Sequence, residues 1–242
     1  MPLGHSRQIG LLIKGQFENW ILLVNFSWNM TRRIAQLIVG VYLYGVGIAL
    51  MVRAGIGVAP WDVLTLGIEK QTGLEFGMIT IITSVFVLLL WIPIRQKPGI
   101  GTLTNVLLVG PSAQLSLEFI PPIEGIVYQV LVFLAGLLVL AIATGLYIGA
   151  RFGPGPRDGL MTGIHNRWGV KIWIARTSIE VVVLSIGWVL GGNVGIGTLA
   201  FALLIGPFVN ITIPRLRVPV IARPEPVDVT GPPTSPVAIQ PS

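Results

Sequence analysis

The sequence predicts an all-α membrane protein with six transmembrane helices, arranged as two inverted three-span repeats that each carry a short broken or interfacial helix. Three observations predict this fold. The 242 residues are 53% hydrophobic and only 11% charged, whereas soluble domains average about 25% charged residues. Long apolar runs recur along the chain. One stretch that interrupts these runs occurs twice, 96 residues apart.

The composition also excludes several kinds of site. The chain has no cysteine, which removes disulfides, thiolate metal sites and cysteine nucleophiles. Its two histidines, His5 and His165, do not predict a metal centre. The net charge of +6 indicates basic cytoplasmic loops rather than a nucleic-acid partner, because membrane proteins concentrate Lys and Arg on that side. No enzyme motif or cofactor motif occurs, so we expect neither an enzyme nor a cofactor.

The first 33 residues are expected to form an N-terminal cytoplasmic segment. The apolar run from Trp20 to Trp28 is too short to span, because spanning takes about 20 apolar residues. Met30 leads directly into the first long span. We therefore hypothesise that Met30 is the true start, and that residues 1–29 are a mis-assigned start or a loose interfacial segment.

Two membrane repeats follow, over residues 34–120 and 121–214. Each contains three full spans and one short helix that begins at a proline. The short helices, Pro60–Gly73 and Pro156–Gly169, reach only about 21 Å, less than the ~30 Å hydrocarbon core. The expected full spans are 34–52, 77–94 and 99–117 in the first repeat, and 126–149, 172–190 and 195–213 in the second.

The repeat itself is gapless. Residues 54–111 align with 150–207, and 20 of these 58 positions are identical. The longest identical run is Gly-Ile-Gly-Thr-Leu, which begins at Gly99 and again at Gly195. Matched glycines, prolines and aspartates make a chance match of apolar helices improbable, so the sequence predicts two related structural units.

The charge distribution predicts the topology. Three spans in each repeat is an odd number, so the two repeats must have opposite orientations. Basic residues then fall on one side of a six-span membrane protein, which the positive-inside rule assigns to the cytoplasm. We expect a multi-pass membrane protein with both termini cytoplasmic, and a disordered proline-rich cytoplasmic tail over residues 215–242. The basic residues on that side include Arg32, Arg33, Arg95, Lys97, Arg151, Arg157, Arg167, Lys171, Arg215, Arg217 and Arg223.

The repeated motif has two interpretations. Proline at the first helical position and a carboxylate in the first turn are ordinary helix-start features. Alternatively, broken helices in inverted repeats place their ends near the membrane midplane, where they bind ions or substrate groups. Arg157 occupies the position of Trp61, and it either supplies cytoplasmic charge or attracts an anionic group. The motif residues are Gly57, Pro60 and Asp62 in the first repeat, and Gly153, Pro156 and Asp158 in the second.

Glu180 is the sharpest single candidate. It lies about 14 Å into its span, and an ionisable group at that depth is costly to bury and therefore suggests function. Ser84 occupies the same position in the first repeat, and Arg176 lies one helical turn before Glu180. The Arg176–Glu180 pair either locks helices together or contributes to a substrate or proton pathway. The Gly-Ile-Gly-Thr sequences at 99–102 and 195–198 indicate tight turns with close helix packing more than anion cradles.

The motifs resemble those of the YczE/YyaS/YitT-type family of bacterial integral membrane proteins. The likeness covers roughly residues 34–212. It implies a multi-span membrane protein without an established general substrate. The segments that carry it are Gly55–Asp62, Gly153–Met161, Arg176–Glu180, Gly187–Gly192 and Val194–Thr198.

These observations lead to two functional hypotheses. The first is a transporter or exporter of an unknown small solute, whose pathway is formed by the two motif loops and Glu180, with Glu180 coupling protons or binding a cationic group. The second is a non-transporting membrane protein that assists or regulates a partner enzyme or secretion system. The lipid bilayer is the expected environment in both, and a homo-oligomer or a membrane partner stays open.

Overall fold

A computed structural model describes the backbone of residues 3–219 and the side chains of residues 27–219. The chain divides into a unit over residues 31–219 and a second unit made of the terminal segments. The described part of the second unit, residues 3–30, is helical and continuous in sequence with the first span. The expected disorder of residues 220–242 lies outside the described residues, and the start at Met30 stays a prediction.

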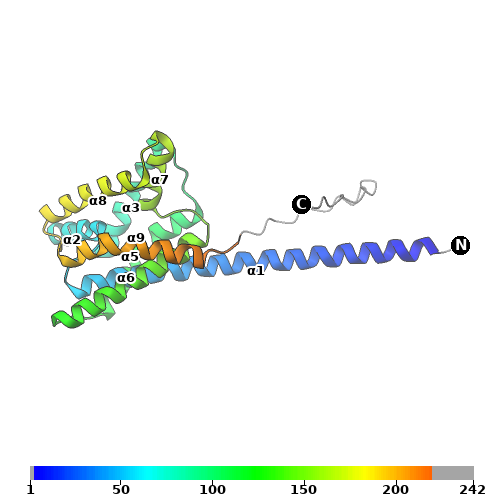
Figure 1. The fold of residues 1–242 in the computed structure, drawn as a ribbon, viewed down its shortest axis with the longest axis horizontal. Helices are drawn as coiled ribbons and strands as arrows, with labels where there is room; N and C mark the ends of the chain where they lie inside the picture. Colours follow the sequence, from blue (N-terminus) through cyan, green and yellow to red (C-terminus); the bar gives the residue numbers. More distant parts are fainter. Residues whose placement is uncertain (1–2, 220–242) are drawn as a thin grey trace. The chain divides into compact units, whose positions relative to one another are not determined.

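Residues 3–219 fold into helices joined by short loops (Figure 1). The helices are α1 (Leu3–Ala54), α2 (Pro60–Thr72), α3 (Phe76–Leu89), α4 (Trp91–Ile94), α5 (Ile100–Phe119), α6 (Ile126–Gly149), α7 (Pro156–Trp168), α8 (Ile172–Val189) and α9 (Ile196–Leu216).

Within the part of the chain that the structure describes, five helical segments are long and apolar enough to cross a membrane, which supports a multi-span membrane protein. They are 27–54, 76–94, 126–149, 172–189 and 196–216. The remaining expected span corresponds to α5, which has 20 residues but is interrupted by threonine, asparagine, glutamine and serine. These polar residues lower its mean hydropathy, so six spans remain a prediction that depends on α5.

The two short helices form where the sequence predicts them. Both α2 and α7 have 13 residues and begin with proline, whose fixed φ and missing N–H suit the first helical position. Both end at a glycine in the left-handed conformation, Gly73 with φ 72° and Gly169 with φ 70°. Glycine adopts this conformation easily because it has no Cβ, and a left-handed residue ends a helix. Each short helix therefore ends about 20 Å from its start.

The two halves hold each other through matching turns. The amide of Gly101, at the start of α5, donates to the carbonyl of Phe152 at 2.9 Å. The amide of Gly197, at the start of α9, donates to the carbonyl of Ile56 at 2.8 Å. Both donors and acceptors are 96 positions apart, so each motif loop packs on the first turn of the last helix in the other half. The interpretation of these glycine turns as close-packing sites is confirmed.

Further hydrogen bonds join three loops at one end of the unit. The Asn193 side chain donates to the Gly55 carbonyl at 3.2 Å, and the Ile123 amide donates to the Arg53 carbonyl at 3.0 Å. These segments are the ones that the charge pattern assigns to one side of the membrane. The broken motif of the first half therefore shares an end with two links that contain no Lys or Arg, residues 118–124 and 191–194.

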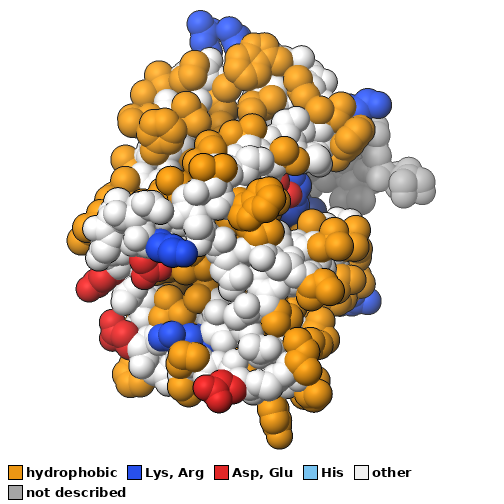
Figure 2. All heavy atoms as spheres, turned by 90° about the vertical axis from the view of Figure 1, so that its left-hand side faces the viewer, with side chains coloured by type: hydrophobic (Ala, Val, Ile, Leu, Met, Phe, Trp, Pro, Cys, Tyr) orange, Lys and Arg blue, Asp and Glu red, His pale blue; other side chains and the backbone are white. Residues whose placement is uncertain are grey.

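The outer surfaces of the helices are strongly apolar. Large hydrophobic side chains such as Phe86, Leu107 and Trp188 are more than 60% exposed. Soluble monomers rarely expose contiguous apolar surface of this extent, so these faces contact lipid. Figure 2 views the unit along its helices and shows hydrophobic side chains over much of that face, with acidic and basic side chains on part of it.

Candidate functional site

The short helices α2 and α7 begin at a shared charged centre. Asp62, in the first turn of α2, is only 1% exposed. The Nη1 atom of Arg157, in the first turn of α7, lies 3.4 Å from its Oδ1 atom. The same guanidinium lies over the indole ring of Trp61, 5.1 Å from the ring centroid. Arg157 therefore joins the two halves of the chain through an ion pair and a cation–π contact.

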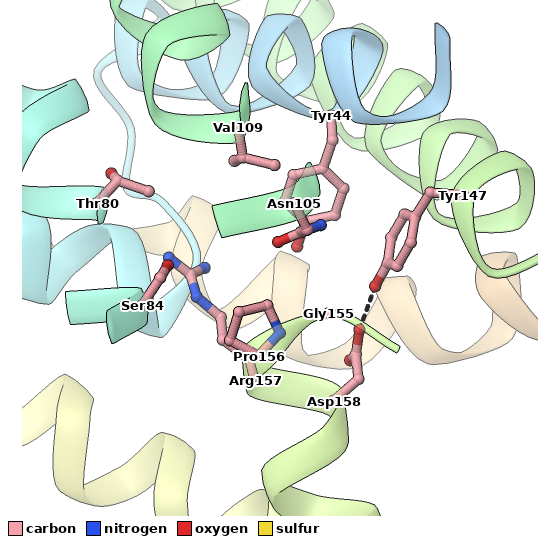
Figure 3. Close-up of a pocket in the computed structure, with 10 residues that line it drawn as sticks. All are labelled: Tyr44, Thr80, Ser84, Asn105, Val109, Tyr147, Gly155, Pro156, Arg157 and Asp158. Carbon is pink, nitrogen blue, oxygen red and sulfur yellow. Dashed lines mark hydrogen bonds between the residues drawn. The ribbon is translucent and has the colours of Figure 1, made fainter. Parts of the chain in front are cut away.

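A small polar cavity of about 20 Å³ lies on one side of Arg157. Figure 3 shows its lining side chains, with Tyr44 and Asn105 directed toward the space next to Arg157. A volume of this size holds about one water molecule. The other polar side chains in its wall are Thr80 and Ser84 from α3, Tyr147 from α6 and Asp158 from α7.

Tyr147 fixes the second carboxylate of the centre. Its hydroxyl donates a hydrogen bond to the Oδ2 atom of Asp158 (Figure 3). Tyr147 is only 2% exposed, and its ring packs edge to face on Tyr44, with centroids 5.9 Å apart. Because Tyr147 belongs to α6 and Tyr44 to α1, the long spans of both halves hold the start of α7 in place.

A second polar cavity, of about 40 Å³, is also lined by Arg157. Glu180 and Arg176 of α8 line it, and the Nε atom of Arg176 donates to the Oε1 atom of Glu180 at 2.9 Å. The predicted intrahelical pair is therefore present. The cavity is completed by Tyr44, Ala59, Pro60, Trp61, Arg157, Asp158, Met161 and Phe201.

The two cavities occupy matching places in the repeat. Both are lined by Tyr44, Arg157 and Asp158. Besides Tyr147, the remaining polar side chains in the wall of the first cavity are Thr80, Ser84 and Asn105. Their partners 96 positions later line the second cavity, and they are Arg176, Glu180 and Phe201. The wall that α3 and α5 form in the first cavity is thus uncharged, whereas the wall that α8 forms in the second cavity is charged.

Comparison with known proteins assigns the chain to a family. A family model described as "Family of unknown function (DUF6198)" matches residues 31–214. The chain belongs to this family. The matched range contains both motif loops and all the residues that line the two cavities.

Curated relatives agree with this assignment. An "Uncharacterized protein" of Haemophilus influenzae is 35% identical over 191 residues, which cover 76% of this chain and 88% of the relative. The Bacillus subtilis "Uncharacterized membrane protein YczE" is 28% identical, with 73% of this chain and 83% of the relative covered. The B. subtilis "Uncharacterized protein YyaS" is 27% identical over 73% of this chain and 90% of the relative. The predicted likeness to YczE and YyaS is confirmed, and no solved structure matches.

In this family member, the structure brings most of the sequence-predicted site residues together. Glu180, Arg176, Arg157 and Asp158 line one cavity. Pro60 lines the same cavity as Glu180. Ser84 and Pro156 line the smaller cavity, and Asp62 pairs with Arg157. The glycines serve the turns instead: Gly57 packs against Thr198, and Gly153 packs against Thr102.

Sequence reasoning missed the two tyrosines of the centre. Tyr44 lies about ten residues into its span, deeper than the interfacial belts where membrane tyrosines usually lie. This depth is a signal that could have identified it. Tyr147 lies near the end of its span, where an interfacial role is the ordinary expectation, and only the packing of α6 against α7 reveals its contact with Asp158.

Sequence reasoning also missed the role of Arg33. Its side chain is 8% exposed, and its Nε and Nη2 atoms donate to the carbonyls of Ala150 and Arg151 at 2.9 and 3.0 Å. The guanidinium lies 4.5 Å from the ring centroid of Phe152. Arg33 therefore caps the last turn of α6 and anchors the second motif loop, in addition to contributing positive charge.

Proposed function

We propose that the protein is a transporter or exporter of a small solute in the bacterial inner membrane. Six spans would form two inverted three-span repeats with both termini in the cytoplasm. The motif loops and Glu180 would form the central pathway, and Glu180 would couple protons or bind a cationic group. The proposal assigns the protein no enzymatic reaction.

One observation carries this proposal. Two broken helices from different halves begin at the same buried place, and Arg157 of one pairs with Asp62 of the other. Buried charges in a membrane protein are costly and mark ion or substrate pathways. Transporters built from inverted repeats place their binding sites at the ends of discontinuous helices near the midplane. The ion pair between the starts of two short helices supports a site of this kind.

The size of the cavities supports a closed state between two open ones. Volumes of about 20 and 40 Å³ leave room for one or a few water molecules. A solute therefore enters only when one half moves relative to the other. The reciprocal packing of each motif loop on the opposite half allows such a movement to open one cavity while the other stays closed.

Flux measurements with purified protein in proteoliposomes test the proposal. Proton movement is followed with an internal pH dye under an imposed pH gradient, with and without a panel of external solutes. We expect protein-dependent flux that falls at least tenfold in Glu180→Gln and in Asp158→Asn. Flux that both variants leave unchanged would reject this centre. The absence of flux, together with a stable co-purifying membrane protein, would favour the partner-assisting alternative.

Topology has a separate test because the chain contains no cysteine. Single cysteines are introduced at exposed positions and labelled in intact cells with a membrane-impermeant maleimide. Lys97→Cys and Glu124→Cys flank α5, and Val194→Cys lies in the turn before α9. We expect labelling from outside at positions 124 and 194, and protection at position 97. Equal labelling at 97 and 124 would show that α5 does not cross.

A further inference from the structure

The charged centre contains an excess of carboxylate. Asp62 pairs with Arg157 and Glu180 pairs with Arg176. Asp158, which lines both cavities, accepts a hydrogen bond from the Tyr147 hydroxyl. Within residues 27–219, Asp158 has no salt bridge to a cation. Three carboxylates therefore face two guanidinium groups, and the imbalance favours a positively charged group beside Asp158.

An apolar groove of about 380 Å³ lies between α3 and α8. Its mouth faces lipid, because Phe86 of α3 and Val182 of α8 are 62% and 56% exposed. The hydroxyl of Thr83 donates to carbonyls of its own helix, so it offers no strong polar contact to the groove. The other lining residues are Trp61, Leu64, Val87, Leu90, Leu160, Ser178, Ile179 and Val183.

The groove adjoins the charged cavity. Trp61 lines both spaces. On α8, Ile179 lines the groove and the next residue, Glu180, lines the cavity. The Nε1 atom of Trp61 is buried and has no hydrogen-bond partner in the described chain. A ligand that spans the two spaces would therefore meet the carboxylate of Glu180 in the cavity and the Trp61 side chain, which lines both spaces.

We propose that the transported solute is an amphipathic organic cation. Its cationic group would lie beside Asp158 and Glu180, and its apolar body would occupy the α3–α8 groove next to Trp61. The charged cavity of about 40 Å³ is too small for a whole organic molecule, whereas the groove is nearly ten times larger. A lipid chain alone would fill the groove and leave Asp158 without a counter-charge. This inference rests on the proposed transport function.

Binding of radiolabelled tetraphenylphosphonium to the purified full-length protein in detergent tests the inference. This probe combines a positive charge with a bulky apolar body. We expect saturable binding that falls at least tenfold in Asp158→Asn, which keeps the acceptor for Tyr147 but removes the charge. Tetraphenylborate, which has the same shape and the opposite charge, is expected not to compete.

A matched pair of substitutions on α8 tests the groove. Val182 lines the groove and is 56% exposed, whereas the adjacent Val181 is 54% exposed and lies outside the lining. Val182→Trp is expected to lower the affinity at least tenfold, and Val181→Trp is expected to leave it within about twofold. Absent saturable binding, displacement by tetraphenylborate, or equal effects of the two tryptophans would overturn the inference.

The outcomes also separate the inference from the proposed function. Glu180-dependent proton or solute flux without tetraphenylphosphonium binding would leave transport standing and reject the substrate class. Groove-dependent binding without flux of any tested solute would support the binding site and reject transport.

Discussion

The two cavities beside Arg157 share a framework and differ in chemistry. In the first half, α3 presents Ser84 to its cavity; in the second half, α8 presents Glu180 at the matching position. Thr80 and Arg176 are a second matched pair, one helical turn earlier. Matching positions therefore line a cavity in both halves, whereas only the second half has charged residues, Arg176 and Glu180, at those positions.

A reciprocal exchange of glycine and tryptophan also distinguishes α3 from α8. Gly77, near the start of α3, lets that helix approach α5: a Cβ there would lie 2.9 Å from the Gly110 carbonyl oxygen. Its partner Trp173 on α8 is 65% exposed. At the other ends the roles reverse, because Gly187 of α8 packs on the backbone of α2 and its partner Trp91 fills the space beside α7.

Trp91, the first residue of α4, acts as a spacer just beyond the end of α3. It is 1% exposed, its ring contacts Gly159, and its Nε1 atom donates to the Pro156 carbonyl at 3.1 Å. The distance of α3 or α8 from its neighbouring helix thus depends on whether glycine or tryptophan occupies the contact position. Helices in the two halves begin at matching positions but do not pack in the same way. Substitutions at matched positions would reveal how much each difference contributes.

The largest effect is expected at Arg157, which occupies the position in the second half that Trp61 occupies in the first. Arg157→Ala would leave Asp62, which is 1% exposed, without its charged partner. Removing one member of a buried pair typically destabilises by about 3–5 kcal/mol. We expect a large fall in the unfolding temperature of the purified protein, measured by thermal denaturation in detergent.

A double variant provides the control for this prediction. Asp62→Asn combined with Arg157→Gln removes both charges, so it should recover part of the stability that Arg157→Ala loses. A double variant that is less stable than Arg157→Ala would contradict the pairing of the two halves.

A smaller effect is expected at Arg33. Arg33→Ala removes two hydrogen bonds from a charged donor to carbonyls of the second motif loop, and it should destabilise by about 2–4 kcal/mol. The neighbouring Arg32 is exposed, so Arg32→Ala should change stability by less than about 0.5 kcal/mol. Denaturation curves that coincide for the two variants would show that Arg33 does not anchor the loop.

The smallest predicted difference compares Gly110 with Gly206. A Cβ at Gly110 would collide with the Gly77 carbonyl, whereas a Cβ at Gly206 would meet no atom within 4 Å. Gly110→Ala should therefore destabilise by about 1–3 kcal/mol, and Gly206→Ala should be neutral or stabilising by up to about 1 kcal/mol. The reverse order in thermal denaturation would contradict the tight packing of α3 on α5.

Much of the fold could be predicted from the sequence, because the relevant signals are local. Prolines at Pro60 and Pro156, with glycines at Gly73 and Gly169, marked the short helices within one residue of their observed ends. The apolar runs located the long spans. The pair of Arg176 and Glu180 followed from the helical repeat alone, since residues four apart lie on one face.

The centre itself could not be predicted in the same way. Its key contacts join residues that are far apart in sequence, such as Arg157 with Asp62. The side chain of a charged residue after a motif proline gives no local sign of which helix start it will reach. The exchange between Gly77 and Trp173 was present in the alignment, but its meaning depends on the neighbouring helix that each residue meets.

A paired flux measurement tests most directly the claim that this centre is a transport pathway with its charge in one half. Glu180→Gln and Ser84→Ala are reconstituted side by side, at equal protein content, in proteoliposomes under the same pH gradient. The account predicts that Glu180→Gln loses at least nine-tenths of the protein-dependent flux, about 1.4 kcal/mol or more in barrier height, while Ser84→Ala keeps at least half. Equal rates in the two variants and in the unmodified protein would contradict it.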